Sequence, residues 1–261
     1  MDLIKIYKFI KWIHVHSNNL SKQIITVNEK FESVDDKCSY PDRIKPGQII
    51  LSINDTVYIV YDEKLEYRVM CKFKSSPGYI QSRYHLFSMD KPIMIYLKHY
   101  ISLLDDTKFF KNYLILGLGI GTMPNYFISK FASINSKQPN MQIERIDCVD
   151  PNSILTKLYK TFFSISDKIH VYNTTGLDFV STTQTKYDCV FIDIPCEFVT
   201  YELMGWIHLI TSKPRKVFLN LINKGIEQID PQVLFDKFTI QNYKKNSYQD
   251  PLKSNHLYLL S

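Results

Sequence analysis

The sequence predicts an α/β fold with a mostly parallel, seven-stranded sheet, preceded by a small antiparallel β unit. From residue 113 onward, short apolar runs alternate with segments of helical pattern, which is typical of a parallel sheet covered by helices on both faces. Some runs, such as Leu114–Leu116 and Val190–Ile192, are apolar without a break, as expected for strands buried on both faces. Upstream, residues 48–73 hold three β-rich runs with no helical pattern between them.

The composition indicates an ordinary soluble protein, with 45% hydrophobic and 22% charged residues in a chain of 261. The formal net charge of +6 comes from lysines interspersed with acidic residues, so it gives no strong nucleic-acid signal. No stretch of about 18 uncharged apolar residues occurs, and no transmembrane helix is expected. The five cysteines form no CxxC pair, which favours reduced thiols, a cytoplasmic location and no metal site.

The chain divides into three parts: residues 1–47 as an N-terminal helix and connector, residues 48–90 as a small β domain, and residues 91–261 as the alternating α/β domain. In the first part, lysines recur at every third position between residues 5 and 11 among apolar residues, so the helix is basic and amphipathic. Packing on the core or in a dimer contact is favoured for it, and contact with a membrane surface stays open as the alternative. Asn54-Asp55 marks a hairpin turn in the second part.

In the third part, each expected strand is followed by a helix. Asp90 and Pro92 mark the start of a helix through IMIYLKHYISLL, because Asp caps helix N-termini and Pro fits the first turn. The expected strands are YLILG, IERIDCV, KIHVY, YDCVFID and KVFLNLI, with helices near residues 122–131, 152–163, 176–181 and 200–211. Residues 238–243 and 256–260 are expected to pair as antiparallel strands.

Three of the chain's 8 glycines follow the first of these strands, at Gly117, Gly119 and Gly121. Since glycine lacks a Cβ, these positions would let the backbone approach a nucleoside and leave helix N–H groups exposed. A tight strand-to-helix turn that needs glycines is the alternative. Thr122 and Met123 depart from the dinucleotide pattern GxGxxG, which counts against a pyrophosphate cofactor.

Polar residues also follow the next three strands, where sheets of this kind bind ligands. Asp150 ends the second strand, where a carboxylate can accept hydrogen bonds from both ribose hydroxyls; a helix N-cap is the alternative. Asp193 ends the fourth strand and would either orient an amine or ammonium group or cap a turn. Thr175 and Gly176 follow the third strand, either at an adenine edge or in a simple turn.

Five segments occur in the order found in a known family: YLILGLGIGTMPNYF, VDPNSILTKLYKTFF, IHVYNTTGLDFV, YDCVFIDIP and VFLNLI. Together they resemble the spermidine-synthase-like branch of the class I S-adenosylmethionine-dependent methyltransferase superfamily. The segment GYIQSRYHL is similar to the junction between the branch's small β domain and its nucleotide domain. The resemblance covers roughly residues 45–261. It implies a Rossmann-like class I methyltransferase fold and S-adenosylmethionine, or its decarboxylated form, as cofactor.

The resemblance also implies roles for particular residues. Gly117, Gly119 and Gly121 match the family's glycine loop, and Asp150 matches its ribose carboxylate, although a shifted register would place Cys148 there.

The remaining matches concern the catalytic side of the expected site. Asp193 matches the carboxylate after the fourth strand, and Tyr96 matches a helix tyrosine that would wall the site. Gln81 matches a cofactor-side glutamine, while Thr175 and Gly176 fall at the adenine side. Asp193 and Tyr96 are therefore the expected catalytic residues.

Four positions depart from the aminopropyltransferases of this branch. Where those enzymes have acidic residues, this chain has Lys98, Ile120, Thr175 and Cys196, although Glu197 adjoins the last of these. A diamine carries two positive charges and needs carboxylates to hold it once it is desolvated. Ordinary polyamine synthesis is therefore disfavoured.

The sequence favours a methyltransferase, or a methyltransferase-like transferase, that binds S-adenosylmethionine. An aminopropyltransferase with an altered acceptor site is the second interpretation, and a non-catalytic fold relative that acts as a binding or assembly partner is the third. The acceptor, whether amine or protein, is not indicated. The branch often dimerises, so a homodimer is an open alternative.

Overall fold

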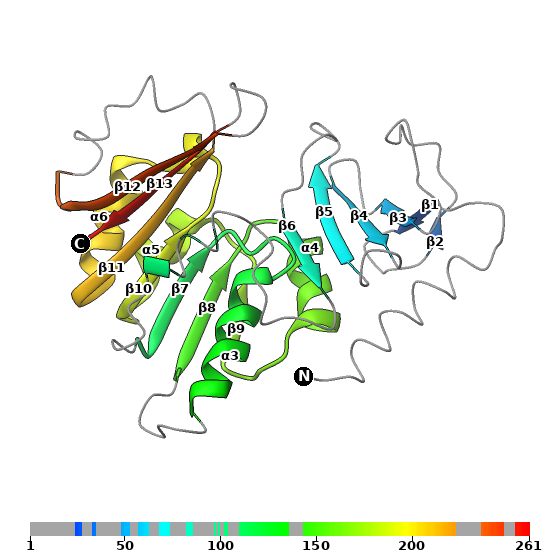
Figure 1. The fold of residues 1–261 in the computed structure, drawn as a ribbon, viewed down its shortest axis with the longest axis horizontal. Coiled ribbons are helices and arrows are strands. Elements are labelled where there is room, and N and C mark those ends of the chain that lie inside the picture. The colour runs from blue at the N-terminus through cyan, green and yellow to red at the C-terminus, as the bar shows by residue number, and fades with distance from the viewer. Residues whose placement is uncertain are drawn as a thin grey trace. The chain divides into compact units, whose positions relative to one another are not determined.

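A computed structural model describes six strands between residues 24 and 85 by their backbone, single helical residues between 97 and 103, and residues 110–135, 143–222, 236–247 and 254–261 (Figure 1). The chain forms two compact units. The first comprises Met1–Met94, Gly119–Ser129 and Ile154–Ile165, and the second comprises Ile95–Leu118, Lys130–Ser153 and Ser166–Ser261. Each unit is described by itself.

The first unit holds a six-stranded sheet with the order β2-β1-β3-β4-β5-β6. Its strands are β1 (Ile24–Val27), β2 (Ser33–Val34), β3 (Gln48–Ser52), β4 (Val57–Asp62), β5 (Arg68–Phe73) and β6 (Ser82–His85). All neighbours are antiparallel except β1 and β3, which are parallel. The expected antiparallel β unit is confirmed. It is larger than expected, because the β-branched run of β1 pairs with β3 although residues 17–47 read as an irregular connector.

The second sheet has seven strands in the order β12-β13-β11-β10-β7-β8-β9. They are β7 (Asn112–Leu116), β8 (Arg145–Val149), β9 (Ile169–Tyr172), β10 (Tyr187–Ile192), β11 (Thr211–Ile222), β12 (Ile240–Ser247) and β13 (Ser254–Leu260). Five neighbouring strands are parallel to one another, in the order β9, β8, β7, β10 and β11. β13 runs antiparallel to both β11 and β12. The expected Rossmann-like, mostly parallel seven-stranded sheet is confirmed.

This strand order contains a switch point. The chain adds β8 and β9 on one side of β7, and then returns to add β10 and β11 on the other side. In open α/β sheets the crevice at such a reversal, beyond the carboxyl ends of the strands, is where ligands bind. The carboxyl ends of β7 and β10 are therefore the place to look for a site.

The helices follow the strands as expected, but two helices and one strand differ from the expected ones in their bounds or geometry. They are α3 (Thr122–Asn135), α4 (Ser153–Leu158), the π-helical turn η1 (Tyr159–Phe163), α5 (Gly176–Thr182), the 3₁₀ turn η2 (Cys196–Phe198) and α6 (Tyr201–Ile210). The helix expected over 152–163 thus changes to π geometry at its end, α3 is longer than expected, and β11 begins directly after α6 rather than at residue 216. No helix within the described part of the chain is long and apolar enough to cross a membrane.

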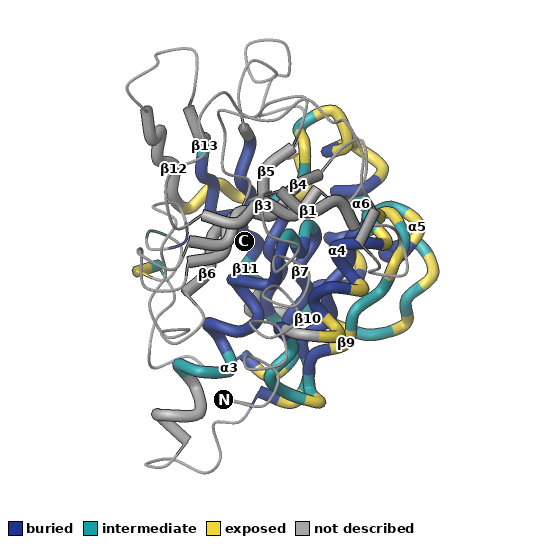
Figure 2. Tube along the Cα trace, turned by 90° about the vertical axis from the view of Figure 1, so that its right-hand side faces the viewer, coloured by how far each residue is buried: buried dark blue, intermediate teal, exposed yellow. Residues whose placement is uncertain are grey.

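The central strands of the second unit consist mostly of buried residues, drawn in dark blue in Figure 2. On one face, alternate residues of β7, β10 and β11 pack with α5 and α6. On the other face, the rings of Phe191 and Phe218 stack with centroids 4.7 Å apart. Leu114, Ile115 and Val190 are fully buried. The unbroken apolar runs in the sequence are explained by this two-sided burial.

One buried charge interrupts the apolar interior of β8. Asp147 is 0% exposed, and both of its carboxylate oxygens accept from Arg145 Nε, at 2.8 and 2.9 Å. Tyr187 donates its hydroxyl to Asp147 Oδ2 at 2.5 Å, and Arg145 donates to the Tyr172 hydroxyl at 2.6 Å. Burial raises the pKa of Tyr187, and the bond to Asp147 adds to this shift. The charge is tolerated because every partner is in place.

The first unit contains a second buried polar cluster, around Gly121. Tyr159 is 0% exposed and donates its hydroxyl to Asn125 Oδ1 at 2.7 Å, while Asn125 Nδ2 donates to the Phe163 carbonyl at 2.8 Å. A Cβ on Gly121 would lie 1.9 Å from Tyr159 Cε2. The π-helical turn carries this ring, so Gly121 is required by the packing of Tyr159.

Candidate functional site

Three of the predicted site residues meet at the switch point of the second unit. Gly117 follows β7, Asp150 follows β8 and Asp193 follows β10. Gly117 N donates to the Val149 carbonyl at 2.9 Å, and Asp193 N donates to the Leu116 carbonyl at 2.8 Å. The ends of the three strands are thus tied together by backbone hydrogen bonds.

All three glycines of the loop have positive φ: +94° at Gly117, +54° at Gly119 and +82° at Gly121. Residues with side chains rarely adopt such angles, which explains the glycines locally. At Gly117 the cause goes further, because a Cβ would lie 2.1 Å from the backbone oxygen of Asp193. The close approach at Gly117 is therefore made by the chain's own backbone, and the glycine alone carries no information about a ligand.

Asp150 anchors the glycine loop. Its Oδ2 accepts from Leu118 N at 3.0 Å and its Oδ1 accepts from Asn152 N at 2.9 Å. The residue is 9% exposed, and its carbonyl accepts from Asn173 Nδ2 at 3.1 Å. The carboxylate therefore bonds both the glycine loop, at Leu118, and the Asn152 N–H group directly before α4.

Asp193 has a partner that the sequence did not single out. Asn220 Nδ2, from β11, donates to Asp193 Oδ1 at 2.8 Å. Asn220 is 0% exposed, whereas Asp193 is half-buried. The register places Leu219 beside Ile192, so the next residues, Asn220 and Asp193, lie side by side. The one available signal was the polar residue inside the apolar run VFLNLI.

Thr175 and Gly176 lie at the start of α5. The Thr175 hydroxyl oxygen accepts from Asp178 N at 3.1 Å and donates to Asp178 Oδ2 at 2.6 Å, so Thr175 is the N-cap of this helix. A Cβ on Gly176 would lie 3.4 Å from the Leu116 side chain, at the end of β7. Thr175 therefore has a local structural role, and Gly176 lies beside the end of β7 in the second unit.

The structure also places two of the positions that depart from the aminopropyltransferases, Ile120 and Cys196. Ile120 is 1% exposed, and Cys196 begins η2, where its thiol donates to Glu197 Oε2 at 3.7 Å. Burial raises the pKa of Cys196, and the Glu197 charge raises it further. Cys148, the alternative match for the ribose carboxylate, is fully buried within β8, and burial raises the pKa of its thiol as well.

Several predicted residues lie outside the described part of the chain: Gln81, Tyr96, Lys98, the N-terminal helix of residues 1–16 and the hairpin turn at Asn54-Asp55. Their predicted roles stay predictions.

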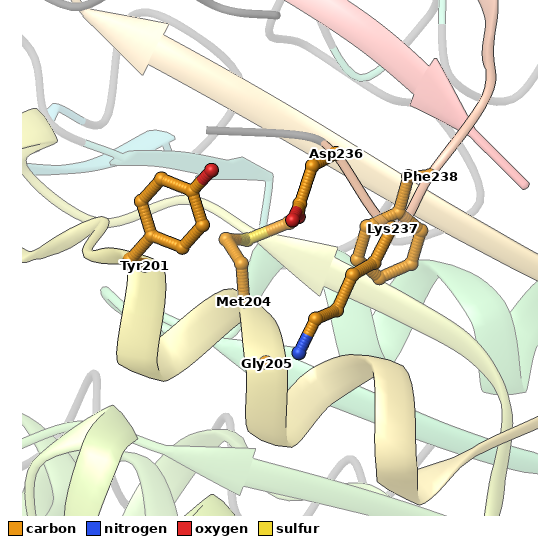
Figure 3. A pocket seen from close by; sticks show the side chains of 6 residues that line it. All are labelled: Tyr201, Met204, Gly205, Asp236, Lys237 and Phe238. Carbon is orange, nitrogen blue, oxygen red and sulfur yellow. The ribbon is translucent and has the colours of Figure 1, made fainter. Parts of the chain in front are cut away.

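A small hollow lies elsewhere in the second unit, between α6 and the residues before β12 (Figure 3). It encloses about 170 Å³, including open solvent, and is lined by Tyr201, Met204, Gly205, Asp236, Lys237 and Phe238. Ligand pockets usually measure roughly 300–1,000 Å³. The hollow is too small for a nucleoside cofactor, and none of the predicted site residues lines it.

No family model matches this chain, and no curated protein sequence matches it. Among solved structures, the chain resembles the N-methyltransferase NodS from Bradyrhizobium japonicum WM9 in complex with S-adenosyl-L-homocysteine, with 11% identity, a TM-score of 0.48, and coverage of 62% of this chain and 83% of that chain. It also resembles the ribosomal protein L11 methylase from Lactobacillus delbrueckii subsp. bulgaricus, with 12% identity and a TM-score of 0.47, covering 92% of this chain and 96% of that one. A third is human methyltransferase-like protein 13 in complex with S-adenosylhomocysteine, with 16% identity and a TM-score of 0.41, covering 56% and 70%. At these identities the likeness is one of architecture.

Proposed function

We propose that this chain is a transferase of the spermidine-synthase-like branch, that it binds S-adenosylmethionine at the carboxyl ends of β7, β8 and β10, and that it transfers the methyl group of this cofactor to an acceptor. The observation that carries the proposal is the meeting of Gly117, Asp150 and Asp193 at the switch point, linked through hydrogen bonds of the strand ends. A nucleoside brings hydroxyl donors and a sulfonium brings positive charge, and two carboxylates at one sheet edge suit both.

The residues would divide the work by their position. Asp150 would accept from the ribose hydroxyls, as the resemblance implies, while it keeps the loop in place. Asp193 would orient the acceptor and take its proton, because its side chain is half-buried and its carboxylate is held by Asn220. Bound there, S-adenosylmethionine supplies a methyl group already activated by the sulfonium, so the chain mainly has to align the acceptor with it.

A non-catalytic binding protein of the same fold is the second candidate. Two observations are compatible with it: a Cβ at Gly117 is excluded by the Asp193 carbonyl, and the Asp150 carboxylate accepts from backbone N–H groups of the loop. Both roles would persist in a relative that had lost its cofactor, so neither residue distinguishes the two candidates by itself.

Calorimetric titration with S-adenosylmethionine and with its decarboxylated form separates the candidates. We expect Asp150→Asn to lower the affinity for the cofactor roughly 10- to 100-fold, since the substitution removes a charge-assisted hydrogen bond worth about 1.5–3 kcal/mol. Asp167→Asn is the matched control, because Asp167 is an exposed carboxylate in the turn before β9. Circular dichroism of each variant reports whether the fold is kept.

Each outcome bears on one candidate. A folded wild-type protein with no affinity for either cofactor would refute the transferase proposal and favour the binding protein. Affinity for the decarboxylated cofactor alone, with formation of spermidine from putrescine, would favour the aminopropyltransferase instead. Equal loss of affinity in the Asp150 and Asp167 variants would remove the role assigned to Asp150.

A further inference from the structure

Asn220 is a buried polar residue in an apolar part of β11. It is 0% exposed, and it pairs in register with Leu257 of β13 on one side while lying beside the end of β10 on the other. Two residues earlier on the same strand, Phe218 stacks on Phe191. An amide in such surroundings costs free energy unless both of its ends are hydrogen-bonded.

Among the described residues, only the nitrogen end of this amide has a partner. Asn220 Nδ2 donates to Asp193 Oδ1 at 2.8 Å, while within the described part of the structure Asn220 Oδ1 has no hydrogen-bond partner. A carboxylate only accepts, so it fixes the amide with its nitrogen toward Asp193 and its oxygen away. The two polar atoms of an amide are about 2.2 Å apart, from bond lengths of about 1.23 and 1.33 Å. The unpartnered oxygen therefore lies within about 5 Å of Asp193 Oδ1, beside the half-buried carboxylate.

We propose that the Asn220 carbonyl oxygen and the Asp193 carboxylate form a two-acceptor subsite for a protonated amine nitrogen. A single ligand atom that serves both neighbouring acceptors must carry at least two hydrogens, and a negative charge beside them favours a cation. A primary or secondary ammonium group meets both demands. A hydroxyl has one hydrogen to donate, and a carboxylate or phosphate would be repelled.

This inference rests on the proposed function only for the identity of the molecule that carries the nitrogen. The nitrogen would belong either to the amino-acid part of the cofactor or to an amine acceptor, and the chemistry of the subsite is the same for both. Asn220 would then determine specificity, because a leucine of similar size at this position offers no acceptor.

The test compares Asn220→Leu with Phe218→Leu. Both changes alter a buried residue on the same face of β11, but Phe218 carries no polar side-chain group and stacks on Phe191. Four ligands are titrated into each protein: S-adenosylmethionine, methylthioadenosine, which lacks the amino-acid part, n-butylammonium, and n-butanol as its neutral analogue. Thermal unfolding of each variant is recorded alongside.

We expect Asn220→Leu to weaken the binding of one ammonium ligand about tenfold or more, because the substitution removes a hydrogen bond to a charged group. The affinities for methylthioadenosine and butanol should not change. Phe218→Leu should lower the unfolding temperature without this selective effect. Loss confined to S-adenosylmethionine identifies the cofactor's ammonium as the nitrogen, and loss confined to butylammonium identifies an amine acceptor.

Two results would overturn the inference: binding of all four ligands unchanged in Asn220→Leu, or no binding of any ammonium ligand to the wild-type protein. A third result separates the two proposals. If butylammonium binds and Asn220→Leu weakens it, while neither S-adenosylmethionine nor methylthioadenosine binds, the amine subsite stands and the transferase proposal fails.

Discussion

Replacing Gly121 with alanine should destabilise the protein strongly, for reasons that can be worked from the structure. The φ of +82° at this position costs a residue with a side chain about 1–2 kcal/mol. The added Cβ would lie 1.9 Å from Tyr159 Cε2, so the ring would have to move by about 1.5 Å to reach an ordinary contact distance. Tyr159 is 0% exposed and its hydroxyl is bonded to Asn125, so that movement breaks the bond.

These effects add up to a large part of the stability of a typical domain. Overpacking a core costs about 1–3 kcal/mol, and leaving a buried acceptor unsatisfied costs about 1–3 kcal/mol more. Together with the backbone cost, Gly121→Ala should lose about 3–8 kcal/mol out of a total of about 5–15 kcal/mol.

Gly205 provides the control within the same chain. It lies inside α6, and a Cβ there would meet nothing closer than Lys237 Nζ, at 3.7 Å. Because glycine weakens a helix interior by about 0.5–1 kcal/mol relative to alanine, Gly205→Ala should be stabilising by about that amount. The same substitution is thus expected to have opposite signs at the two positions.

The measurement is urea-induced unfolding followed by circular dichroism, with the free energy extrapolated to water. If Gly121→Ala does not fold, the double variant Gly121→Ala/Tyr159→Leu tests the mechanism, since removing the ring should recover part of the loss. The reasoning is refuted if Gly121→Ala lies within about 0.5 kcal/mol of the wild type, or if Gly205→Ala is as destabilising as Gly121→Ala.

Three further predictions concern buried polar groups. Asp147→Asn should lower the unfolding free energy by about 1–3 kcal/mol, since it removes the charge that holds its arginine and tyrosine partners; urea unfolding within about 0.5 kcal/mol of the wild type would contradict this. Burial raises the pKa of Tyr187 above its usual 10.0, so the folded chain keeps a proton that the unfolded chain loses at high pH. The unfolding free energy of the wild type should therefore fall as pH rises above 10.0, and it should fall less steeply in Tyr187→Phe. Parallel plots of unfolding free energy against pH for the two proteins would refute this. Among the described cysteines, iodoacetamide should modify half-buried Cys196 before fully buried Cys148, and faster in Glu197→Gln, because losing that charge lowers the thiol pKa; mass-spectrometric mapping that finds Cys148 modified first would contradict this.

Much of the fold follows from the sequence, because two-sided burial leaves an unbroken apolar pattern. Leu114–Leu116 and Val190–Ile192 lie in β7 and β10, and their apolar character alone predicted central strands. The ends of elements were harder to predict. β11 starts at Thr211 and contains Pro214, which has no N–H to donate, and its register against β10 shifts between Thr211 and Lys216. Such a register shift depends on the neighbouring strand and leaves no local signal.

The candidate site was predictable in position but not in detail. Asp193 stands at the end of a recognisable strand, so its place at the switch point could be expected. Its link to Asn220 depends on the register of β10 against β11, which pairs residues 27 positions apart. Likewise, the glycine pattern suggested a ligand, whereas at Gly117 the contact that excludes a Cβ comes from the Asp193 carbonyl. Both the Asp193–Asn220 hydrogen bond and the close approach at Gly117 depend on contacts between strands that are distant in the sequence. The local pattern of residue types does not predict such contacts.

The place of β13 has a consequence for biosynthesis. This strand comes after both β11 and β12 in the chain, yet it lies between them and pairs with each along nearly its whole length. Until residues 254–260 have left the ribosome, one edge of β11 has no strand to pair with, and open edges invite association between nascent chains. The pairing of β11 and β12 in this half of the sheet is therefore complete only after β13 has been made.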